Sequence, residues 1–460
     1  MKEIPFLSSA PPDFIWPQCP EADRFVRDRV EAFCRRDAFA GGLAEEMRAR
    51  TSTCFFDWVD HLILADESVD RAELKSIGYR SREASAGSET RLWVHPHAQL
   101  PSLCLEPEAQ EDRVAIGVEQ IEDFATAHEL TPRIQGGRRS TCRLADLGDR
   151  STLRLIERRG GDGLEPDPRD RWDLYEGQLR LWLDFKAGCV GQADPEAAMT
   201  AAEAEADRMI EALGVHAAAA CFLEAERRYW QSRNDAAQLQ KKRQDALGLG
   251  WANHDHHTFR SSRLLFSRLV RLLGAFGFER RERFYAGAEA GWGAQVMEQP
   301  TAGYVIFADV DLKPQEVALD FATTPLEPSD KLGTVGLWCA LHGDSILEAG
   351  MHHLEAQFDF EKLRDDLAAE GIETMAPFSD FEYLKQAFTT AERWDVRPDR
   401  LKRLLDEGKI GPEAAERIGS DGAVGSHLEN LQRRNGYKGF NQSAVNRIIQ
   451  QVNPERQALH

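Results

Sequence analysis

Two histidines and one glutamate lie at comparable places in the second half of this 460-residue sequence and could bind one metal ion together. His256 lies in an expected strand that opens one strand–helix–strand unit, and His353 lies in the first strand of a second unit. Glu429 lies in the strand expected to close the second unit. Two imidazoles and one carboxylate can bind one face of a divalent metal ion and leave the other positions open for substrate and dioxygen. Since the set contains no cysteine, it favours Fe(II), with Mn²⁺ and Zn²⁺ as alternatives.

A guanidinium is expected beside this set, because Arg260 follows His256 by four residues. Alternate side chains of an extended strand share a face, so His256, Thr258 and Arg260 should point one way. His257 and Phe259 should point the other way, towards the amphipathic helix that follows. A guanidinium can bind a carboxylate through two parallel hydrogen bonds. Arg260 is therefore predicted to hold a carboxylate of the substrate.

The elements that position these residues form two units between residues 251 and 460. The first unit is expected to contain strands near 255–260, 283–286, 294–297 and 304–307, with an apolar-periodic helix after the first strand. The second unit is expected to contain a strand over 351–358, a helix over 360–369, a mostly helical insertion over 377–422 and a last strand over 427–432. We therefore expect 251–460 to be one metal-binding catalytic domain of the α+β class.

The first half divides into three predicted regions. Residues 1–50 read as a helical N-terminal arm, 51–193 as a degenerate pair of similar units that ends in a connector over 160–193, and 194–250 as a helical connector. The repeat is motivated by Asp60-His61, which opens a unit as Asp255-His256 does, and by Glu157, which ends a unit as Glu429 does. His61 and Glu157 should then face one cavity. Without a third ligand, this half is expected to be structural or to shape the entrance to the pocket.

Two long helices are expected in the connector. Asp194 and Pro195 suit the cap and the first turn of a helix that ends before Gly214. A second helix is expected over 216–247, where Gly248 stops it.

The composition excludes some classes of protein. A formal net charge of -20 argues against nucleic acid as a partner, because phosphate binding needs a basic surface. No apolar run is long enough to span a bilayer, and the first residues lack the plan of a signal peptide. The eight cysteines are scattered without a Cys-x-x-Cys pair, which favours reduced thiols in a cytoplasmic protein.

Short motifs in the second half occur in the order and at the positions of a known family. Its Asp-His-x-x-x-Arg motif is matched by Asp255, His256 and Arg260. Its Asn-His-x-Thr motif is matched in part by 352–355, and its Glu-Phe-Ala-Arg/Glu-Arg motif is matched loosely by 429–433. Its closing Gly-Phe resembles 439–440. Residues 251–460 thus resemble the 2-oxoadipate dioxygenase/decarboxylase family of the vicinal oxygen chelate superfamily. The resemblance covers less than half of the chain.

The resemblance implies paired βαβββ units of the vicinal oxygen chelate type. It also implies an Fe(II) ion held by His256, His353 and Glu429, and a substrate carboxylate held by Arg260. Family members convert a 2-oxo acid and O₂ into a hydroxy acid with loss of CO₂. We therefore expect a non-haem iron dioxygenase/decarboxylase that acts on a 2-oxo acid or a related small carboxylic acid.

The sequence departs from the family at His352 and Glu355, where the family has Asn and Thr, so the substrate stays open. A metal-dependent lyase or isomerase on the same scaffold is one alternative, which a lack of oxygen uptake would favour. A non-catalytic protein that binds a small ligand is another, which a failure to bind metal would favour. His254, His257 and His352 are expected to be structural.

Overall fold

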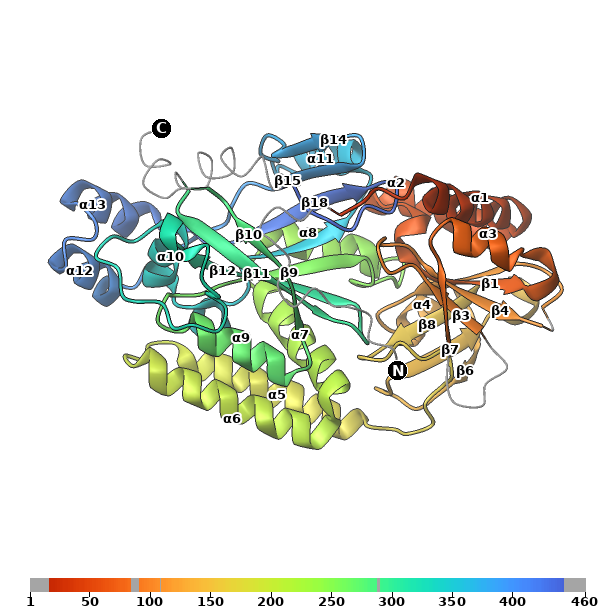
Figure 1. Cartoon of the computed structure of the whole chain (residues 1–460), viewed down its shortest axis with the longest axis horizontal. Coiled ribbons are helices and arrows are strands. Elements are labelled where there is room, and N and C mark those ends of the chain that lie inside the picture. The colour runs from red at the N-terminus through yellow and green to blue at the C-terminus, as the bar shows by residue number, and fades with distance from the viewer. Residues whose placement is uncertain (1–15, 84–90, 108, 288–289, 442–460) are drawn as a thin grey trace.

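Two eight-stranded sheets with the same strand order form the framework of the chain (Figure 1). The computed structural model describes residues 16–83, 91–107, 109–287 and 290–441. The N-terminal sheet has the order β2-β3-β4-β1-β5-β8-β7-β6, and the C-terminal sheet has the order β10-β11-β12-β9-β13-β18-β15-β14. In each sheet the first strands of two βαβββ units are antiparallel neighbours, and each is parallel to the last strand of its own unit. The fold is therefore α+β, with paired βαβββ units of the vicinal oxygen chelate type.

The strands of the N-terminal sheet are β1 (Val59–Ala65), β2 (Arg80–Glu83), β3 (Arg91–Val94), β4 (Ser102–Glu106), β5 (Arg113–Gly117), β6 (Arg133–Gln135), β7 (Cys142–Asp146) and β8 (Arg154–Arg158). Those of the C-terminal sheet are β9 (His254–Arg260), β10 (Glu279–Tyr285), β11 (Trp292–Gln299), β12 (Tyr304–Asp311), β13 (His353–Gln357), β14 (Ser379–Phe381), β15 (Leu384–Phe388) and β18 (His427–Arg433). A separate two-stranded ribbon pairs β16 (Arg393–Trp394) with β17 (Ala423–Val424).

The α-helices are α1 (Pro20–Arg36), α2 (Ala38–Thr51), α3 (Arg71–Ser76), α4 (Ile121–Ala127), α5 (Trp172–Cys189), α6 (Pro195–Leu213), α7 (Val215–Gln231), α8 (Asp235–Asp245), α9 (Phe266–Ala275), α10 (Thr334–His342), α11 (Phe360–Ala369), α12 (Pro398–Asp406) and α13 (Pro412–Asp421). A π-helical turn, Ser345–Ala349, follows α10. None of the described helices is long and apolar enough to cross a membrane.

One face of the C-terminal sheet is apolar and packs on helices. Phe259, Leu354 and Leu428 point from three central strands into a core that also contains residues of α5, α6, α7 and α9. These four helices lie together on one side of the C-terminal sheet (Figure 1). Because side chains alternate along a strand, the neighbours of these residues point to the opposite face. That opposite face carries the polar residues of the candidate site.

The helices of the connector begin and end for local reasons. The Asp194 carboxylate accepts hydrogen bonds from the backbone of Glu196 and Ala197, and Pro195 occupies the first turn of α6, as the sequence predicts. Gly214 ends this helix with φ 78°, a backbone conformation that favours glycine.

The expected second connector helix over 216–247 is wrong in one respect, because the chain forms two helices there. Asn234 separates α7 from α8, and its side chain accepts a hydrogen bond from the backbone of Ala237. An asparagine that caps a new helix competes with continuation of the preceding one.

The connector predicted over 160–193 contains an 18-residue helix, α5. Its buried residues Tyr175, Leu179, Trp182 and Lys186 recur at spacings of three or four. Gly177 lies inside the helix and weakens the local helical propensity. Packing on α6 and α7 in the main core overrides this weak propensity.

The insertion over 377–422 is helical only in its second part. Its first part supplies β14 and β15, which complete the C-terminal sheet beside β18. Four of the five residues of β15 are buried, so the strand lacks the polar alternation that marks a half-exposed strand.

Candidate metal centre

The three predicted ligands lie together at the centre of the C-terminal sheet. One ligand atom from each of His256, His353 and Glu429 lies within 4.8 Å of the others, and all three side chains are buried. His353 Nε2 lies 3.0 Å from Glu429 Oε2. The structure therefore brings together residues that are separated by up to 173 positions in the sequence.

Strand register accounts for this convergence. Thr258 of β9 lies opposite His353 of β13, and Glu355 of β13 lies opposite His256. Glu355 also lies beside Glu429 of β18 in the parallel ladder. Paired residues on neighbouring strands point to the same face, so all five side chains project from one side of the sheet.

His256 is oriented by carboxylates on the side of its Nδ1 atom. This atom lies 3.3 Å from Asp255 Oδ1 and also contacts Glu355 Oε2. Arg433 holds Asp255 with two contacts of 3.1 Å, and Gln99 donates a hydrogen bond of 2.6 Å to Asp255 Oδ2. A carboxylate behind a histidine fixes the ring and its tautomer, and leaves the other nitrogen free for a metal.

The Gln386 side chain bridges two carboxylates of the site. Its Nε2 donates hydrogen bonds of 3.0 Å to Glu355 Oε1 and to Glu429 Oε1. Gln386 lies on β15, which pairs with β18. A neutral donor shared by two acids lowers their mutual repulsion and fixes their positions.

Burial sets the protonation states of the site. Burial, with a further contribution from Arg260, lowers the pKa of His353 to about 3, and burial also lowers the pKa of His256. Both imidazoles are therefore neutral, which is the form that binds metals. Burial raises the pKa of Glu429, and burial together with the charge of Glu429 raises the pKa of Glu355. A divalent cation bound here would supply the positive charge that favours the ionised form of these two carboxylates.

Arg260 points into the same pocket as the three ligands, as the alternation of β9 predicts. Its guanidinium lies 5.4 Å from the ring centre of Trp338. It forms no hydrogen bond or ion pair with the side chains or backbone of the described residues. Its backbone N–H donates to Ser345 Oγ at 2.9 Å, and Ser345 O accepts from the buried Lys186 at 2.7 Å. Helix α5 thus supports the strand that carries Arg260.

Asp309 stands next to Arg260 on the neighbouring strand β12. Burial raises the pKa of Asp309 to about 7, although Arg260 acts in the opposite direction. The carboxyl lines the pocket with Arg260 and therefore changes charge near neutral pH within reach of any ligand that Arg260 binds.

The pocket around these residues has a volume of about 80 Å³. Its lining comprises His256, Thr258, Arg260, Phe284, Trp292, Phe307, Asp309, His352, His353, Phe378, Gln386, Phe388, Glu429, Phe440 and Asn441. The candidate ligands, one guanidinium and a largely aromatic wall therefore share one cavity.

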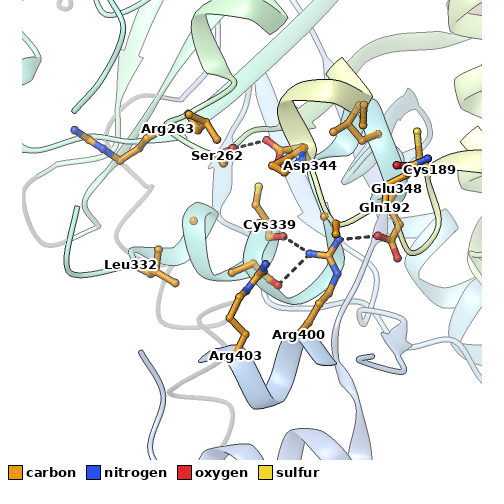
Figure 2. A pocket seen from close by; sticks show the side chains of 18 of the residues that line it. Cys189, Gln192, Ser262, Arg263, Leu332, Cys339, Asp344, Glu348, Arg400 and Arg403 are labelled. Carbon is orange, nitrogen blue, oxygen red and sulfur yellow. Dashed lines mark hydrogen bonds and ion pairs between the residues drawn. The ribbon is translucent and has the colours of Figure 1, made fainter. Parts of the chain in front are cut away.

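A larger cavity of about 370 Å³ lies elsewhere, between α10, α12 and the loop that follows β9 (Figure 2). None of its described lining residues is a histidine. Most of its charged groups have ion-pair or backbone partners. Arg400 donates to the carbonyls of Cys339 and Ala340 at the end of α10 and to Glu348 (Figure 2). Asp344 accepts from Ser262 (Figure 2). The larger cavity therefore contains none of the three candidate metal ligands.

The N-terminal sheet contains an equivalent position that cannot bind a metal in the same way. When His61 is aligned with His256, the strand pairing of the N-terminal sheet puts Arg113 at the position that His353 occupies in the C-terminal sheet. In the same way, Arg154 occupies the position of Glu429. Glu106 takes the position of Asp309 and lies 2.8 Å from Arg113. Two guanidinium groups in place of two ligands exclude a cation from this position.

One arrangement is nevertheless common to both halves. Asp60 contacts His61 Nδ1 at 2.6 Å and is held by Arg158, as Asp255 is held by Arg433 behind His256. In the ladder, Arg158 occupies the place that corresponds to Arg433.

The expectation that His61 and Glu157 face one cavity is wrong. Glu157 shares its face of the sheet with Leu155, in the core that packs on α4, and accepts a hydrogen bond of 3.0 Å from the backbone of Ile121. His61 points to the opposite face, because it pairs with Ala115 beside Arg154. Glu157 thus binds the N-terminus of α4, where a carboxylate is favourable.

Several residues of the site were not predicted from the sequence as site residues. Asp255 and Arg433 lie within recognised motifs, so their pairing could have been anticipated. Gln386 and Asp309 carry no local signal: the strand of Gln386 was read as helix, and Asp309 lies beyond the strand end expected at residue 307.

No protein-family model matches the sequence, and no curated protein matches it. Among solved structures, the chain is similar to a mutant of 4-hydroxymandelate synthase from Streptomyces coelicolor, at 13% identity and a TM-score of 0.29, over 87% of this chain and 99% of that one. It is similar to YdcJ, an uncharacterized protein from Shigella flexneri that includes the domain DUF1338, at 12% identity and a TM-score of 0.25, over 57% and 73%. It is also similar to the Mn(II)-bound glyoxalase from Novosphingobium aromaticivorans, at 8% identity and a TM-score of 0.20, over 82% of each chain. The description of the fold rests on the strand order of the two sheets.

Proposed function

We propose that this chain is a non-haem iron dioxygenase/decarboxylase that acts on a 2-oxo acid. The observation that carries the proposal is the convergence of His256, His353 and Glu429 on one buried point. Beside it lies the guanidinium of Arg260, for which the described residues supply no hydrogen bond or ion pair. In a complex with a 2-oxo acid, three protein ligands leave positions for the substrate and O₂.

The ligand atoms present fit a metal ion. Ligand atoms that lie about 2.0–2.2 Å from a common ion are roughly 3 Å apart when they occupy adjacent positions. The distance of 3.0 Å between His353 Nε2 and Glu429 Oε2 agrees with this geometry. Neutral imidazoles and a carboxylate without a thiolate are suited to Fe(II), and also to Mn²⁺.

Each residue of the site has a distinct role in this proposal. Iron, when bound, would supply the redox chemistry that activates dioxygen. Arg260 binds the substrate carboxylate through its planar fork and so fixes the orientation of the 2-oxo group. Asp255 and Glu355 orient His256, and the aromatic wall excludes water from the reacting atoms.

The N-terminal half has a supporting role in this proposal. It repeats the strand order and the Asp–His–Arg arrangement of the C-terminal half, but two ligand positions contain arginine. Gln99 reaches from this half to Asp255, directly behind His256. We assign it the role of a degenerate copy that positions the site.

The test is metal analysis of the purified protein and of His256→Ala, His353→Ala and Glu429→Ala. The wild-type protein should hold about one metal ion per chain, and each variant should lose most of it. His97→Ala, which alters an exposed histidine in the N-terminal half, is the matched control and should keep the metal. Wild-type metal content in all three site variants would refute the assignment.

Oxygen consumption with a panel of 2-oxo acids tests the reaction. Uptake of O₂ and release of CO₂ by the Fe(II)-loaded protein is the expected result. Turnover of a substrate without oxygen uptake would point instead to a metal-dependent lyase or isomerase. Absence of metal would point to a protein that only binds a small ligand.

A further inference from the structure

Six aromatic side chains surround the space in front of the candidate ligands: Phe284, Trp292, Phe307, Phe378, Phe388 and Phe440. They come from β10, β11, β12, β15 and the segments before β14 and after β18. Elements from both units of the C-terminal sheet therefore contribute to one aromatic wall.

The rings pack as pairs, which fixes their positions. Phe284 and Trp292 have ring centres 5.5 Å apart, and Phe378 and Phe388 have ring centres 4.8 Å apart. Phe307 and Phe440 meet edge to face at 4.5 Å. A wall of this kind presents ring faces and edges to a ligand, which is the geometry that favours another aromatic group.

Few positively charged side chains line the pocket. Arg260 is the one Lys or Arg side chain among the described residues that line the pocket.

Two other guanidinium groups contact a ring of the aromatic wall, and both are already paired. Arg281 and Arg433 lie against the ring of Phe440, where Arg281 pairs with Glu282 and Arg433 pairs with Asp255. Neither residue lines the pocket.

A second carboxylate on the substrate would therefore find no second cationic side chain among the described residues that line the pocket. It would lie against aromatic carbon or near Asp309, and the transfer of an unpaired charge into such surroundings is costly. An aromatic group would instead bury apolar surface against the ring pairs.

We infer that the substrate is a 2-oxo acid with a single carboxylate and an aromatic side group, and not a dicarboxylic acid such as 2-oxoadipate. This inference rests on the proposed function, since it assigns the substrate class of the same site.

The test compares binding of three probes to the Mn²⁺-loaded protein by calorimetry: phenylpyruvate, 2-oxoadipate and 2-oxohexanoate. Phenylpyruvate should bind at least about tenfold more tightly than 2-oxoadipate, because ring contacts add to the burial of apolar surface. The aliphatic monocarboxylate 2-oxohexanoate has neither a ring nor a second carboxylate, so it separates the effect of the ring from that of the second charge. Its affinity should lie between those of phenylpyruvate and 2-oxoadipate. Equal or tighter binding of 2-oxoadipate would overturn the inference.

Substitutions in the wall give a second measurement. Phe388→Leu should reduce the preference for phenylpyruvate over 2-oxohexanoate severalfold. Phe381→Leu, at an exposed ring outside the pocket, should leave the preference unchanged. An unchanged preference in Phe388→Leu would contradict the role of the wall.

Oxygen consumption separates this inference from the proposed function. If phenylpyruvate binds tightly and no 2-oxo acid supports oxygen uptake, the dioxygenase proposal fails and the substrate class stands. If 2-oxoadipate alone supports oxygen uptake, the dioxygenase proposal stands and the substrate class is wrong.

Discussion

His256 shows how one side chain of the site is held from two directions. Asp255 and Glu355 contact its Nδ1 atom, while its ring lies 4.7 Å from the ring of Phe307 on the pocket side. Because these contacts are buried, the ring has little freedom to rotate away from the other ligands. The free energy of metal binding is then not spent on ordering this ligand.

Arg260→Lys should separate substrate binding from metal binding. Lysine keeps the charge but loses the planar fork, so the affinity for a 2-oxo acid should fall by about tenfold or more, while the metal content holds. Calorimetry and elemental analysis measure the two quantities. Arg263→Lys is the control, because Arg263 pairs with Glu316 and faces the other cavity. Unchanged affinity in Arg260→Lys would exclude the assigned role.

Asp309→Asn should remove a pH dependence. The pKa of Asp309 is raised to about 7 by burial, against the effect of Arg260 on β9, and the charge of Glu429 on β18 raises it further. As the pH rises through about 7, Asp309 ionises beside Arg260 and repels a substrate carboxylate, so affinity should fall. The Mn²⁺-loaded variant should keep its affinity over this range. Identical pH profiles for the two proteins would count against Asp309.

At the scale of elements, strand register decides which residues meet. A shift of one residue between β9 and β13 would turn His353 and Glu355 into the helical core and bring Leu354 into the pocket. The buried apolar face of the same strands prevents that shift, since Phe259 and Leu354 would lose their core contacts. The hydrophobic core therefore maintains the geometry of the polar site.

Asn234→Ala should destabilise the junction between α7 and α8. Asn234 is fully buried, caps α8 through Ala237 and donates a hydrogen bond of 3.0 Å to Ser426 before β18. Loss of both contacts should lower the free energy of unfolding by about 2 kcal/mol in urea denaturation. Asn234→Ser retains a cap and should lose less. An equal loss in both variants would show that the cap contributes nothing.

At the scale of the molecule, the two halves meet behind the candidate metal centre. The backbone of Gln99 donates to Gly436 O at 3.0 Å, and Ala98 forms a β-bridge with Tyr437. The carbonyls of Tyr437 and Gly439 accept hydrogen bonds from Arg433, which holds Asp255. The N-terminal half thus contacts the group that orients His256.

Gln99→Leu should weaken metal binding from the N-terminal half, which contributes none of the three candidate ligands. Without its amide, Asp255 loses one of its hydrogen-bond donors and orients His256 less firmly, so the metal dissociation constant should rise by about tenfold. Thermal unfolding of the metal-free protein should change little. Gln120→Leu, which removes an exposed contact to Asp123 in the same half, is the control. Equal metal affinity in both variants would refute the supporting role.

The sequence by itself determined the local features of this protein. Alternation along β9 placed Arg260 on the same face as His256 and on the opposite face from Phe259. Caps and apolar spacing identified α6, α9 and α11. These signals depend on neighbouring residues alone. Only the tertiary structure decided which distant residues join the site. Gln386, Asp309 and Gln99 reach it through strand pairing and the contact between halves, which no local pattern encodes. Glu157 was misplaced for the same reason, since the face to which a strand residue points depends on the register of the whole sheet.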